Sequence, residues 1–405
     1  MSSLDFLSRL AHPNASKLVL LVLDGVGDLA SPGQPRTALE AAATPNFDAL
    51  AARSALGRIV PVATGITPGS GPGHLALFGY DPALPDNDIG RGVLEALGLG
   101  LELAPGDVAA RGNFATADAS GKLVDRRAGR IPTAECERIA GKLNAALAGV
   151  AGARCEVVAG EAHRFVFLVR GAGLSPEIAD TDPQDLGVSP LAARAESAAA
   201  EATAEIVRRA VAAMDNAIAD EPKANRVLLR GFSKLPHLPA MPQLYRMRCG
   251  AFAGYPLYRG VASACGMQVV PCGKRIDDIL AVVAARWDDF DFFFLHVKQT
   301  DQAGEDGNLV AKREVIEEVD RALPRLLALA PDVLAVTGDH STPAPMKAHS
   351  FHPVPVLVAA PIAFADDARR FTEREALRGH LGTFPSRDLL ALMLAHAGRL
   401  AKFGA

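Results

Sequence analysis

Four short apolar runs constrain what this chain can fold into. The first, Leu18–Leu23, consists only of leucine and valine and is followed by Asp24. Comparable runs occupy residues 291–297, 332–337 and 354–359. Uninterrupted apolar runs of this length are typical of strands buried on both faces, as in parallel sheets. We therefore expect all four runs to be strands of one parallel sheet.

Helical patterns separate these runs. Apolar residues recur at helical spacing over 274–286, 309–330 and 386–399. Because strands and helices alternate along the chain, we predict an α/β fold: an open sheet with helices on both faces.

The middle of the chain has a different pattern, which indicates a second domain. Its expected elements are strands at 164–170 and 226–230 and alanine-rich helices at 133–149 and 191–218. Proline and glycine mark both ends, at Pro105-Gly106 and between Pro236 and Pro242. We predict an inserted α+β domain over residues 107–243, which leaves a discontinuous sheet domain over residues 1–106 and 244–405.

Composition argues against several classes of partner. The 405 residues carry a formal net charge of −4 and only 5% are aromatic, so we expect no nucleic acid partner. Apolar runs such as Leu18–Leu23 are far shorter than the roughly 20 residues that span a bilayer, so we expect no membrane partner. The N-terminal segment lacks the apolar stretch of a signal peptide, and the five cysteines show no pairing pattern. We therefore expect a cytoplasmic location.

Acidic and histidine side chains flank the strand ends that should meet at one edge of the sheet, where open α/β sheets bind their ligands. Six of them lie directly before or shortly after the apolar runs: Asp24, Asp301, Glu305, Asp339, His340 and His349. Several acids in one place raise each other's pKa unless cations neutralise them. Mixed carboxylate and imidazole ligation suits Mn, Zn or Mg. The pattern therefore predicts a divalent-metal site.

Ser70 lies in a loop rich in glycine and proline, just before a segment from His74 that should be helical. A hydroxyl at a helix N-terminus is well placed for a phosphate, because free N–H groups and the helix dipole favour an anion. A neighbouring metal ion would lower the pKa of the hydroxyl and make it a nucleophile. Ser70 is therefore the candidate nucleophile.

Basic side chains recur in the inserted segment. They include Arg111, Arg126, Arg127, Arg130, His163, Arg164 and Arg230. The planar guanidinium group binds phosphate or carboxylate with two hydrogen bonds, so these residues are candidates for binding an anionic substrate. A solvated basic face is the alternative interpretation.

Together these motifs are similar to those of the archaeal-type, 2,3-bisphosphoglycerate-independent phosphoglycerate mutases of the alkaline phosphatase superfamily. The resemblance runs from about residue 17 to residue 395. The matching motifs are Asp24-Gly, Pro68-Gly-Ser70 with the following His74-Leu-Ala-Leu-Phe-Gly-Tyr-Asp81-Pro, Arg111-Gly-Asn-Phe114, Asp125-Arg-Arg-Ala-Gly-Arg130, Lys298-Gln-Thr-Asp301, Gly338-Asp-His340-Ser-Thr-Pro and His349-Ser-Phe-His-Pro-Val-Pro355.

The resemblance implies an isomerase of glycolysis that interconverts 3-phosphoglycerate and 2-phosphoglycerate through a phosphoserine at Ser70. It also implies two divalent ions, manganese in the first place with magnesium or zinc as alternatives, and no organic cofactor. One ion would be held by Asp24, Ser70, Asp339 and His340. The other would be held by Asp301, Glu305 and His349. The glycerate part of this small phosphorylated substrate would be held by Asn113, Arg127, Arg130 and His163.

Two positions depart from the family pattern. Glu305 stands where the family has histidine, and Phe351-His352 stands where Gly-Asp is usual. A carboxylate at residue 305 should favour Mn or Mg over Zn. Two alternative functions are a metal-dependent phosphohydrolase or phosphomutase of the same superfamily acting on another phosphate or phosphonate ester, and a catalytically impaired binding protein. The arginine-rich insertion favours the mutase, and the presence of Asp24 and Ser70 argues against a pure binding protein.

Overall fold

The computed structural model describes residues 3–150 and 152–404, and these form two compact units. The inserted unit is Ile89–Pro236, and the sheet unit is the remainder of the chain. These boundaries lie at 88/89 and 236/237, whereas the sequence suggested 106/107 and 243/244. The earlier first boundary follows from helix α5 (Arg91–Gly98), which packs on strands β3 (Val108–Ala117) and β7 (Arg226–Ser233) of the inserted unit.

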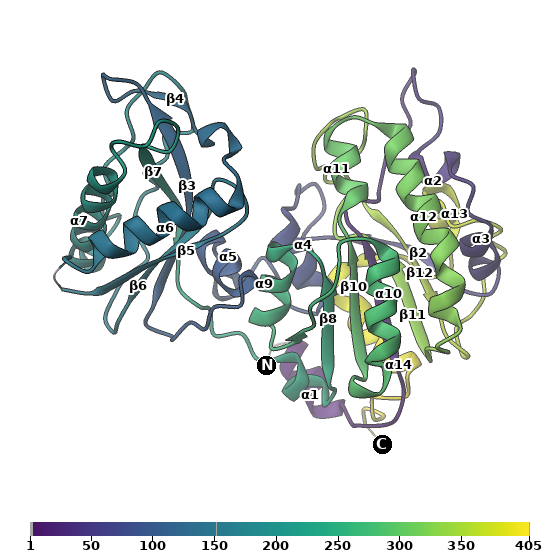
Figure 1. Cartoon of the computed structure of the whole chain (residues 1–405). Coiled ribbons are helices and arrows are strands. Elements are labelled where there is room, and N and C mark those ends of the chain that lie inside the picture. Colours follow the sequence, from purple (N-terminus) through teal and green to yellow (C-terminus); the bar gives the residue numbers. More distant parts are fainter. Residues whose placement is uncertain (1–2, 151, 405) are drawn as a thin grey trace. The chain divides into compact units, whose positions relative to one another are not determined.

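The sheet unit is built on one eight-stranded sheet, in the order β13-β2-β12-β11-β1-β10-β8-β9 (Figure 1). Its strands, in chain order, are β1 (Leu18–Leu23), β2 (Ala55–Val60), β8 (Cys249–Ala253), β9 (Gln268–Val269), β10 (Phe292–Val297), β11 (Val333–Thr337), β12 (Val354–Ala359) and β13 (Gly382–Pro385). The four strands that the apolar runs predicted are all present, and β1 lies between β10 and β11 at the centre.

The expectation that all four runs are parallel is wrong for one of them. Strand β1 is parallel to β10 and β11, with Leu21 opposite both Leu295 and Val336, but β12 is antiparallel to β11. An apolar run indicates that a strand is buried, but it does not indicate the direction of the strand in the sheet. The antiparallel direction brings the start of β12 to the edge where β1, β10 and β11 end. For this reason His349, which precedes β12, reaches the same edge as Asp24.

Helices cover both faces of this sheet, which confirms the predicted fold class. In Figure 1, α10 (Ile276–Ala285) and α12 (Leu309–Leu327) lie in front of the sheet and α14 (Leu389–His396) lies behind it. The other helices of this unit are α1 (Ser3–Leu10), α2 (Ala38–Ala41), α3 (Pro45–Ala51), α4 (Ser70–Leu77), α8 (Met241–Tyr245), α9 (Pro256–Ala264), α11 (Gln299–Glu305) and α13 (Glu373–Arg378).

The inserted unit is a five-stranded sheet in which every described pairing is antiparallel. Besides β3 and β7, its elements are β4 (Leu123–Asp125), α6 (Thr133–Leu147), β5 (Arg154–Ala159), β6 (Arg164–Arg170) and α7 (Glu201–Ala217). Residues of α6 and α7 share one apolar core with Phe114, Phe165 and Phe167 of the sheet. The unit therefore has the predicted α+β character.

The helix expected over residues 191–218 begins only at Glu201. Before it, the backbone runs alongside residues 178–181, where Ala179 N donates to Arg194 O and Leu191 N donates to Thr181 O. Tertiary pairing thus outweighs the helix propensity of this alanine-rich segment.

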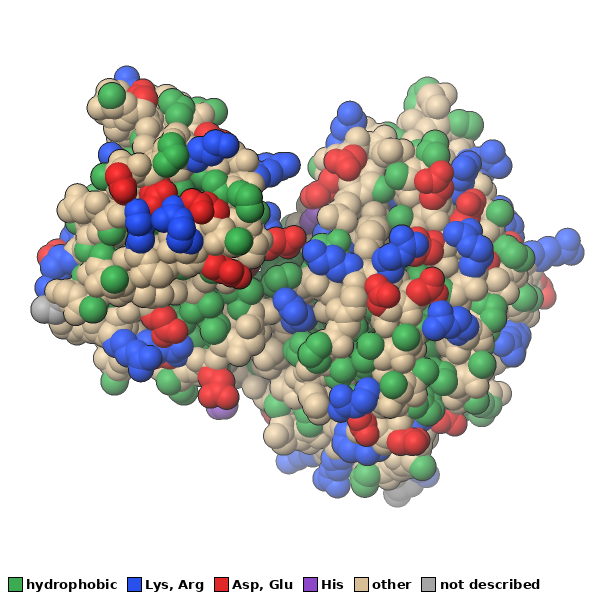
Figure 2. Space-filling view, in the orientation of Figure 1, with side chains coloured by type: hydrophobic (Ala, Val, Ile, Leu, Met, Phe, Trp, Pro, Cys, Tyr) green, Lys and Arg blue, Asp and Glu red, His purple; other side chains and the backbone are tan. Residues whose placement is uncertain are grey.

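In the ranges 3–150 and 152–404, no helix is both long and apolar enough to cross a bilayer. Basic and acidic side chains are interspersed over the visible face of each unit (Figure 2), so that face presents no extended field of one sign.

Candidate metal centre

The carboxyl edge of the central strands gathers the predicted ligands of the sheet unit. Two overlapping groups of predicted ligands form there: Asp24, Asp339 and His340, and Asp301, His340 and His349. A third group, Asp24 with His74 and His296, adds two histidines that the sequence prediction did not assign. Within each group, one ligand atom from each residue lies within 4.8 Å of the others. All except His349 are fully buried. The topology explains this meeting, because β1, β10 and β11 end at this edge and β12 begins there.

Ser70 is the first residue of α4, so the helix begins four residues earlier than the expected start at His74. Its Oγ lies 3.3 Å from Nε2 of His340. Gly73, one turn into the helix, allows this approach, because a Cβ there would lie 2.6 Å from the carbonyl oxygen of Asp339. The predicted nucleophile therefore lies beside the ligand groups and at the amino end of a helix.

The buried charges of this site compensate one another. Burial alone would raise the pKa of Asp24, but His296, Lys298 and His340 outweigh it and hold that pKa well below its usual range. Burial opposes the charge of Lys298, yet Asp24 and Asp301 raise the pKa of its ammonium group. Lys298 donates a hydrogen bond to Asp301, and its Nζ lies 3.5 Å from Asp24 Oδ1. The carboxylate of Asp24 is therefore held in the ionised form that binds metal.

The donor atoms fit divalent metal ions. Oδ1 of Asp24 is buried and accepts no hydrogen bond from any residue that the structure describes. Nζ of Lys298 and Nε2 of His340 lie 3.5 and 3.4 Å from this oxygen. A buried carboxylate oxygen that lacks a hydrogen bond can accept a metal ion in addition. The oxygen and imidazole ligands of both groups match Mn, Mg or Zn and not a metal that needs thiolates.

Glu305 lies at the margin of the site. It is the last residue of α11, four positions after Asp301, and so faces the same side of that helix. Its Oε1 lies 3.7 Å from His349 Nε2, and 53% of its side chain is exposed. Among the described residues, no compact ligand group includes Glu305. His352 turns toward its own loop, where Nδ1 lies 3.1 Å from Ser350 Oγ and the ring stacks on Phe351.

Three residues that the sequence prediction did not assign contact the ligands. Thr342 donates its hydroxyl hydrogen to Asp301, Nε2 of His296 lies 2.9 Å from Asp24 Oδ2, and Nδ1 of His74 lies 3.1 Å from Asp339 Oδ2. His296 could have been found from sequence, because it is the one polar side chain in the run Phe292–Val297. Thr342 and His74 lie within the family motifs but carried no assigned role.

The predicted substrate residues lie in the inserted unit. Asn113 on β3 pairs in register with Arg164 on β6, and Arg111 pairs with Arg230 on β7. Burial and then the charges of nearby arginines lower the pKa of His163 to about 4. The arginines that exert this effect are Arg164, Arg111, Arg127 and Arg130. The structure therefore brings the predicted basic residues around one imidazole.

Several details of this basic cluster distinguish its members. Asn113 Oδ1 and His163 Nδ1 are buried and have no hydrogen-bond partner within the described part of the chain. Arg126, by contrast, binds the buried carboxylate of Asp182 with two hydrogen bonds of 2.9 and 2.7 Å. Arg130 ends a left-handed turn with φ of +52°, a conformation that non-glycine residues rarely adopt and that is concentrated at functional sites.

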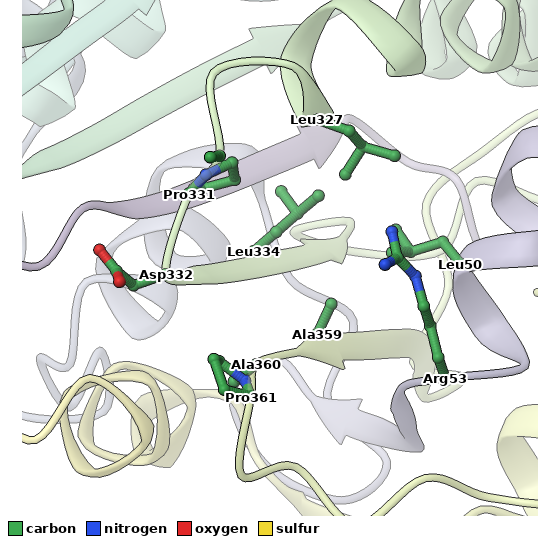
Figure 3. Close-up of a pocket in the computed structure, with 10 residues that line it drawn as sticks. Leu50, Arg53, Leu327, Pro331, Asp332, Leu334, Ala359, Ala360 and Pro361 are labelled. Atoms are coloured by element: carbon green, nitrogen blue, oxygen red, sulfur yellow. The ribbon is translucent and has the colours of Figure 1, made fainter.

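A pocket of about 400 Å³ lies at the opposite edge of the main sheet, between the start of β11 and the end of β12 (Figure 3). Its polar side chains are Arg53 and Asp332, and Asp332 already accepts a hydrogen bond from the backbone of Lys17. The remaining lining residues are apolar or small. The pocket therefore lacks the ligand chemistry of the carboxyl edge.

The sequence of this chain is similar to a known family and to named proteins of other organisms. The family model described as 2,3-bisphosphoglycerate-independent phosphoglycerate mutase matches residues 51–224. A protein of Thermus thermophilus named "Probable 2,3-bisphosphoglycerate-independent phosphoglycerate mutase" is 51% identical over the whole of both chains. A protein of the same name from Thermotoga neapolitana is 48% identical, covering 99% of this chain and 98% of its own.

Two solved structures are similar to this chain over nearly its whole length. The cofactor-independent phosphoglycerate mutase of Thermoplasma acidophilum is 30% identical with a TM-score of 0.71, covering 95% of this chain and 100% of its own. A protein from Pyrococcus horikoshii is also 30% identical, with a TM-score of 0.83 and coverage of 96% and 99%.

The fold and the two ligand groups define an α/β enzyme with a candidate centre for divalent metal ions. Within that class, the chain belongs to the 2,3-bisphosphoglycerate-independent phosphoglycerate mutase family, whose members are isomerases. The family predicted from the sequence motifs is confirmed.

Proposed function

We propose that this chain interconverts 3-phosphoglycerate and 2-phosphoglycerate by passing the phosphoryl group through Ser70. The observation that carries the proposal is the position of Ser70 Oγ at the amino end of α4, 3.3 Å from His340 in the ligand cluster. A hydroxyl in this position can attack a phosphate that the helix N-terminus and Lys298 attract.

The proposed reaction has two transfers. In the first, the Ser70 hydroxyl loses its proton and Oγ forms a bond to phosphorus while the bond between phosphorus and the substrate's 3-oxygen breaks, and that oxygen takes up one proton and leaves as a hydroxyl. In the second, the 2-hydroxyl of glycerate loses its proton and attacks phosphorus, and Ser70 leaves. The two transfers together give an isomer and consume no water.

We assign the ligands as follows. Asp24, Ser70, Asp339 and His340 would hold one divalent ion, and Asp301, Glu305 and His349 would hold the other. When bound, the ions would neutralise the phosphate and lower the pKa of the Ser70 hydroxyl. The buried Oδ1 of Asp24, which accepts no hydrogen bond from the described residues, supports the first assignment. Two of the three ligands of the second set are carboxylates, which supports manganese.

Basic residues of the inserted unit would bind the substrate's carboxylate and hydroxyl groups. Asn113, Arg127, Arg130 and His163 are the proposed contacts, because the arginine charges meet around His163. A small anionic substrate fits this concentration of guanidinium groups. The five cysteines are unpaired, which supports our proposal that the protein works in the cytoplasm.

The test is an enolase-coupled assay of the metal-stripped protein with 3-phosphoglycerate, with and without added Mn²⁺. We expect activity only with Mn²⁺, and phosphate on the Ser70 peptide in mass spectra of protein quenched during turnover. Free phosphate is measured in the same samples. Release of phosphate without formation of 2-phosphoglycerate would assign the chain as a phosphohydrolase instead.

A further inference from the structure

Two buried imidazoles, which the proposed ligand assignment does not use, lie against the candidate metal centre. His74 belongs to α4 and His296 to β10, and both side chains are fully shielded from solvent. Each contacts the carboxylate of a different proposed ligand, Asp339 for His74 and Asp24 for His296.

The contact of His296 leaves one oxygen of Asp24 available. Nε2 of His296 lies 2.9 Å from Oδ2 of Asp24. Because an ionised carboxylate only accepts, Nε2 must carry the proton. The other ring nitrogen, Nδ1, meets no hydrogen-bond partner in the described part of the chain, and neither does Oδ1 of Asp24. One carboxylate oxygen is therefore fixed by a hydrogen bond, and the other, with Nζ of Lys298 3.5 Å away, remains able to bind a metal ion.

The contact of His74 uses the other ring nitrogen. Its Nδ1 lies 2.8 Å from the carbonyl oxygen of Ser70 and 3.1 Å from Oδ2 of Asp339. The hydrogen bond goes to Ser70, whereas Oδ2 of Asp339 lies within ion-pair distance and accepts no hydrogen bond from the described residues. Both neighbours are acceptors, so Nδ1 carries the proton. Nε2 of this ring has no partner among the described residues. His74 therefore connects the backbone of the proposed nucleophile to a proposed metal ligand.

Aromatic side chains hold both rings in place. Tyr258 of α9 stacks on His296 with ring centroids 3.6 Å apart, and Phe294 meets the edge of His74 at 5.6 Å. The two imidazoles themselves lie 5.1 Å apart. A buried ring nitrogen without a hydrogen-bond partner costs stability. Each of these two imidazoles has one such nitrogen among the described residues. An apolar ring of similar size would avoid that cost, so stability alone does not account for imidazoles here.

We infer that His74 and His296 are positioning residues of the metal centre. His74 orients Asp339 and Ser70 through its Nδ1–H group, and His296 orients Asp24 through its Nε2–H group. The inference rests on the proposed function, because it concerns the same metal centre. Hydrogen-bonded partners that orient ligands commonly govern metal affinity without touching the ion.

The use of different nitrogens provides a matched test. The amide nitrogen of asparagine lies two bonds beyond Cβ, like Nδ1, and that of glutamine lies three bonds beyond Cβ, like Nε2. His296→Gln and His74→Asn should therefore keep the donor in place, whereas His296→Asn and His74→Gln should misplace it. Mn²⁺ affinity of the four purified variants is measured by titration calorimetry on metal-stripped protein.

We expect His296→Gln and His74→Asn to bind Mn²⁺ within about threefold of wild type, and the two misplaced variants to bind 10- to 100-fold more weakly. Equal affinities for Asn and Gln at both positions would overturn the inference, whether both variants bind well or both bind weakly. Three ions per wild-type chain, with one lost in every His296 variant, would also overturn it, because the imidazoles would then be ligands.

A second measurement needs no variant and no metal. Long-range ¹H–¹⁵N spectra of metal-free wild-type protein at pH 8 should place a proton on Nδ1 of His74 and on Nε2 of His296. The opposite tautomer at either residue would overturn the inference even if some variants fail to fold. Failure of the proposed function gives a different result: wild-type protein that binds no Mn²⁺ or forms no 2-phosphoglycerate, with the tautomers unchanged.

Discussion

The ammonium nitrogen of Lys312 lies 2.8 Å from the carbonyl oxygen of Thr342 and 3.1 Å from that of Gly27. Lys312 belongs to α12 and is fully buried. Gly27 follows Asp24 in one ligand-bearing loop, and Thr342 follows His340 in another. One buried cation therefore joins two of the loops that carry the proposed ligands, and Oδ2 of Asp28 lies 4.0 Å away as its nearest carboxylate contact of the described residues.

Replacing Lys312 should therefore cost far more than replacing an exposed basic residue of the same helix. Lys312→Met leaves two buried carbonyls and a buried carboxylate without their cation, which should lower the free energy of unfolding by about 3 kcal/mol. Arg325→Met is the control, because Arg325 pairs with Asp277 at the surface and should lose at most about 1 kcal/mol. Urea unfolding in EDTA measures both. Equal losses would show that the two loops do not depend on Lys312.

Ser70→Ala should abolish the proposed phosphoryl transfer without unfolding the protein. Removing the acceptor hydroxyl should lower the mutase rate at least ~10³-fold, since a covalent route cannot proceed without it. Ser120→Ala, in the loop between β3 and β4, serves as the control and should keep the wild-type rate. A Ser70→Ala rate within tenfold of wild type would rule out the phosphoserine mechanism.

The sequence predicted the sheet more completely than the chemistry at its edge. The four apolar runs became β1, β10, β11 and β12, because strands buried on both faces need apolar residues at every position. The same logic missed β2 and β8, whose sequences Ala55–Val60 and Cys249–Ala253 include glycine, and the short strands β9 and β13. Strands β2 and β8 are largely buried, but glycine and other small or charged residues interrupt their apolar pattern. Strands β9 and β13 carry weak patterns because they are short and few of their side chains are buried.

The direction of β12 and the side chains that contact the proposed metal ligands could not be predicted from sequence patterns. The direction of β12 depends on how the chain returns to the sheet, and the apolar run carries no trace of it. His296 lies inside an apolar run in which every side chain is buried, so the pattern assigns it no special role. Its contact with Asp24 joins residues 272 positions apart. By contrast, Asp24, Asp301, Asp339 and His340 lie within four residues after strand ends, so strand topology alone indicated that they meet.

Residue 305 should govern which metal the second proposed site prefers. Glu305→His replaces a carboxylate beside His349 with an imidazole, which should raise the affinity for Zn²⁺ relative to Mn²⁺ at least about tenfold. Glu314→His, at an exposed position of α12, adds the same imidazole away from the site and should change neither affinity. Competition titrations with the two metals measure the ratio. An unchanged ratio in Glu305→His would mean that residue 305 is not a ligand.

The inserted unit contains a carboxylate that should make stability depend on pH. Asp215 lies in the last turn of α7, where the helix dipole disfavours a negative charge. Its Oδ1 accepts a hydrogen bond of 2.9 Å from the backbone of Val227, and Arg226 is 4.0 Å away. Burial nevertheless dominates and raises the pKa of Asp215 from 3.8 to about 6.

Because the folded-state pKa of Asp215 is the higher one, the folded protein holds this proton more tightly than the unfolded chain does. Its contribution to stability is therefore fully present below pH 3.8 and is lost as pH rises through about 6.

Asp215→Asn keeps the acceptor for Val227 but never ionises, so it should be more stable than wild type by about 2 kcal/mol at pH 8. The difference should shrink toward zero near pH 4. Urea unfolding at pH 4, 6 and 8 measures it, with the exposed Asp220→Asn as the control. A gain that does not grow with pH would exclude Asp215 as its source.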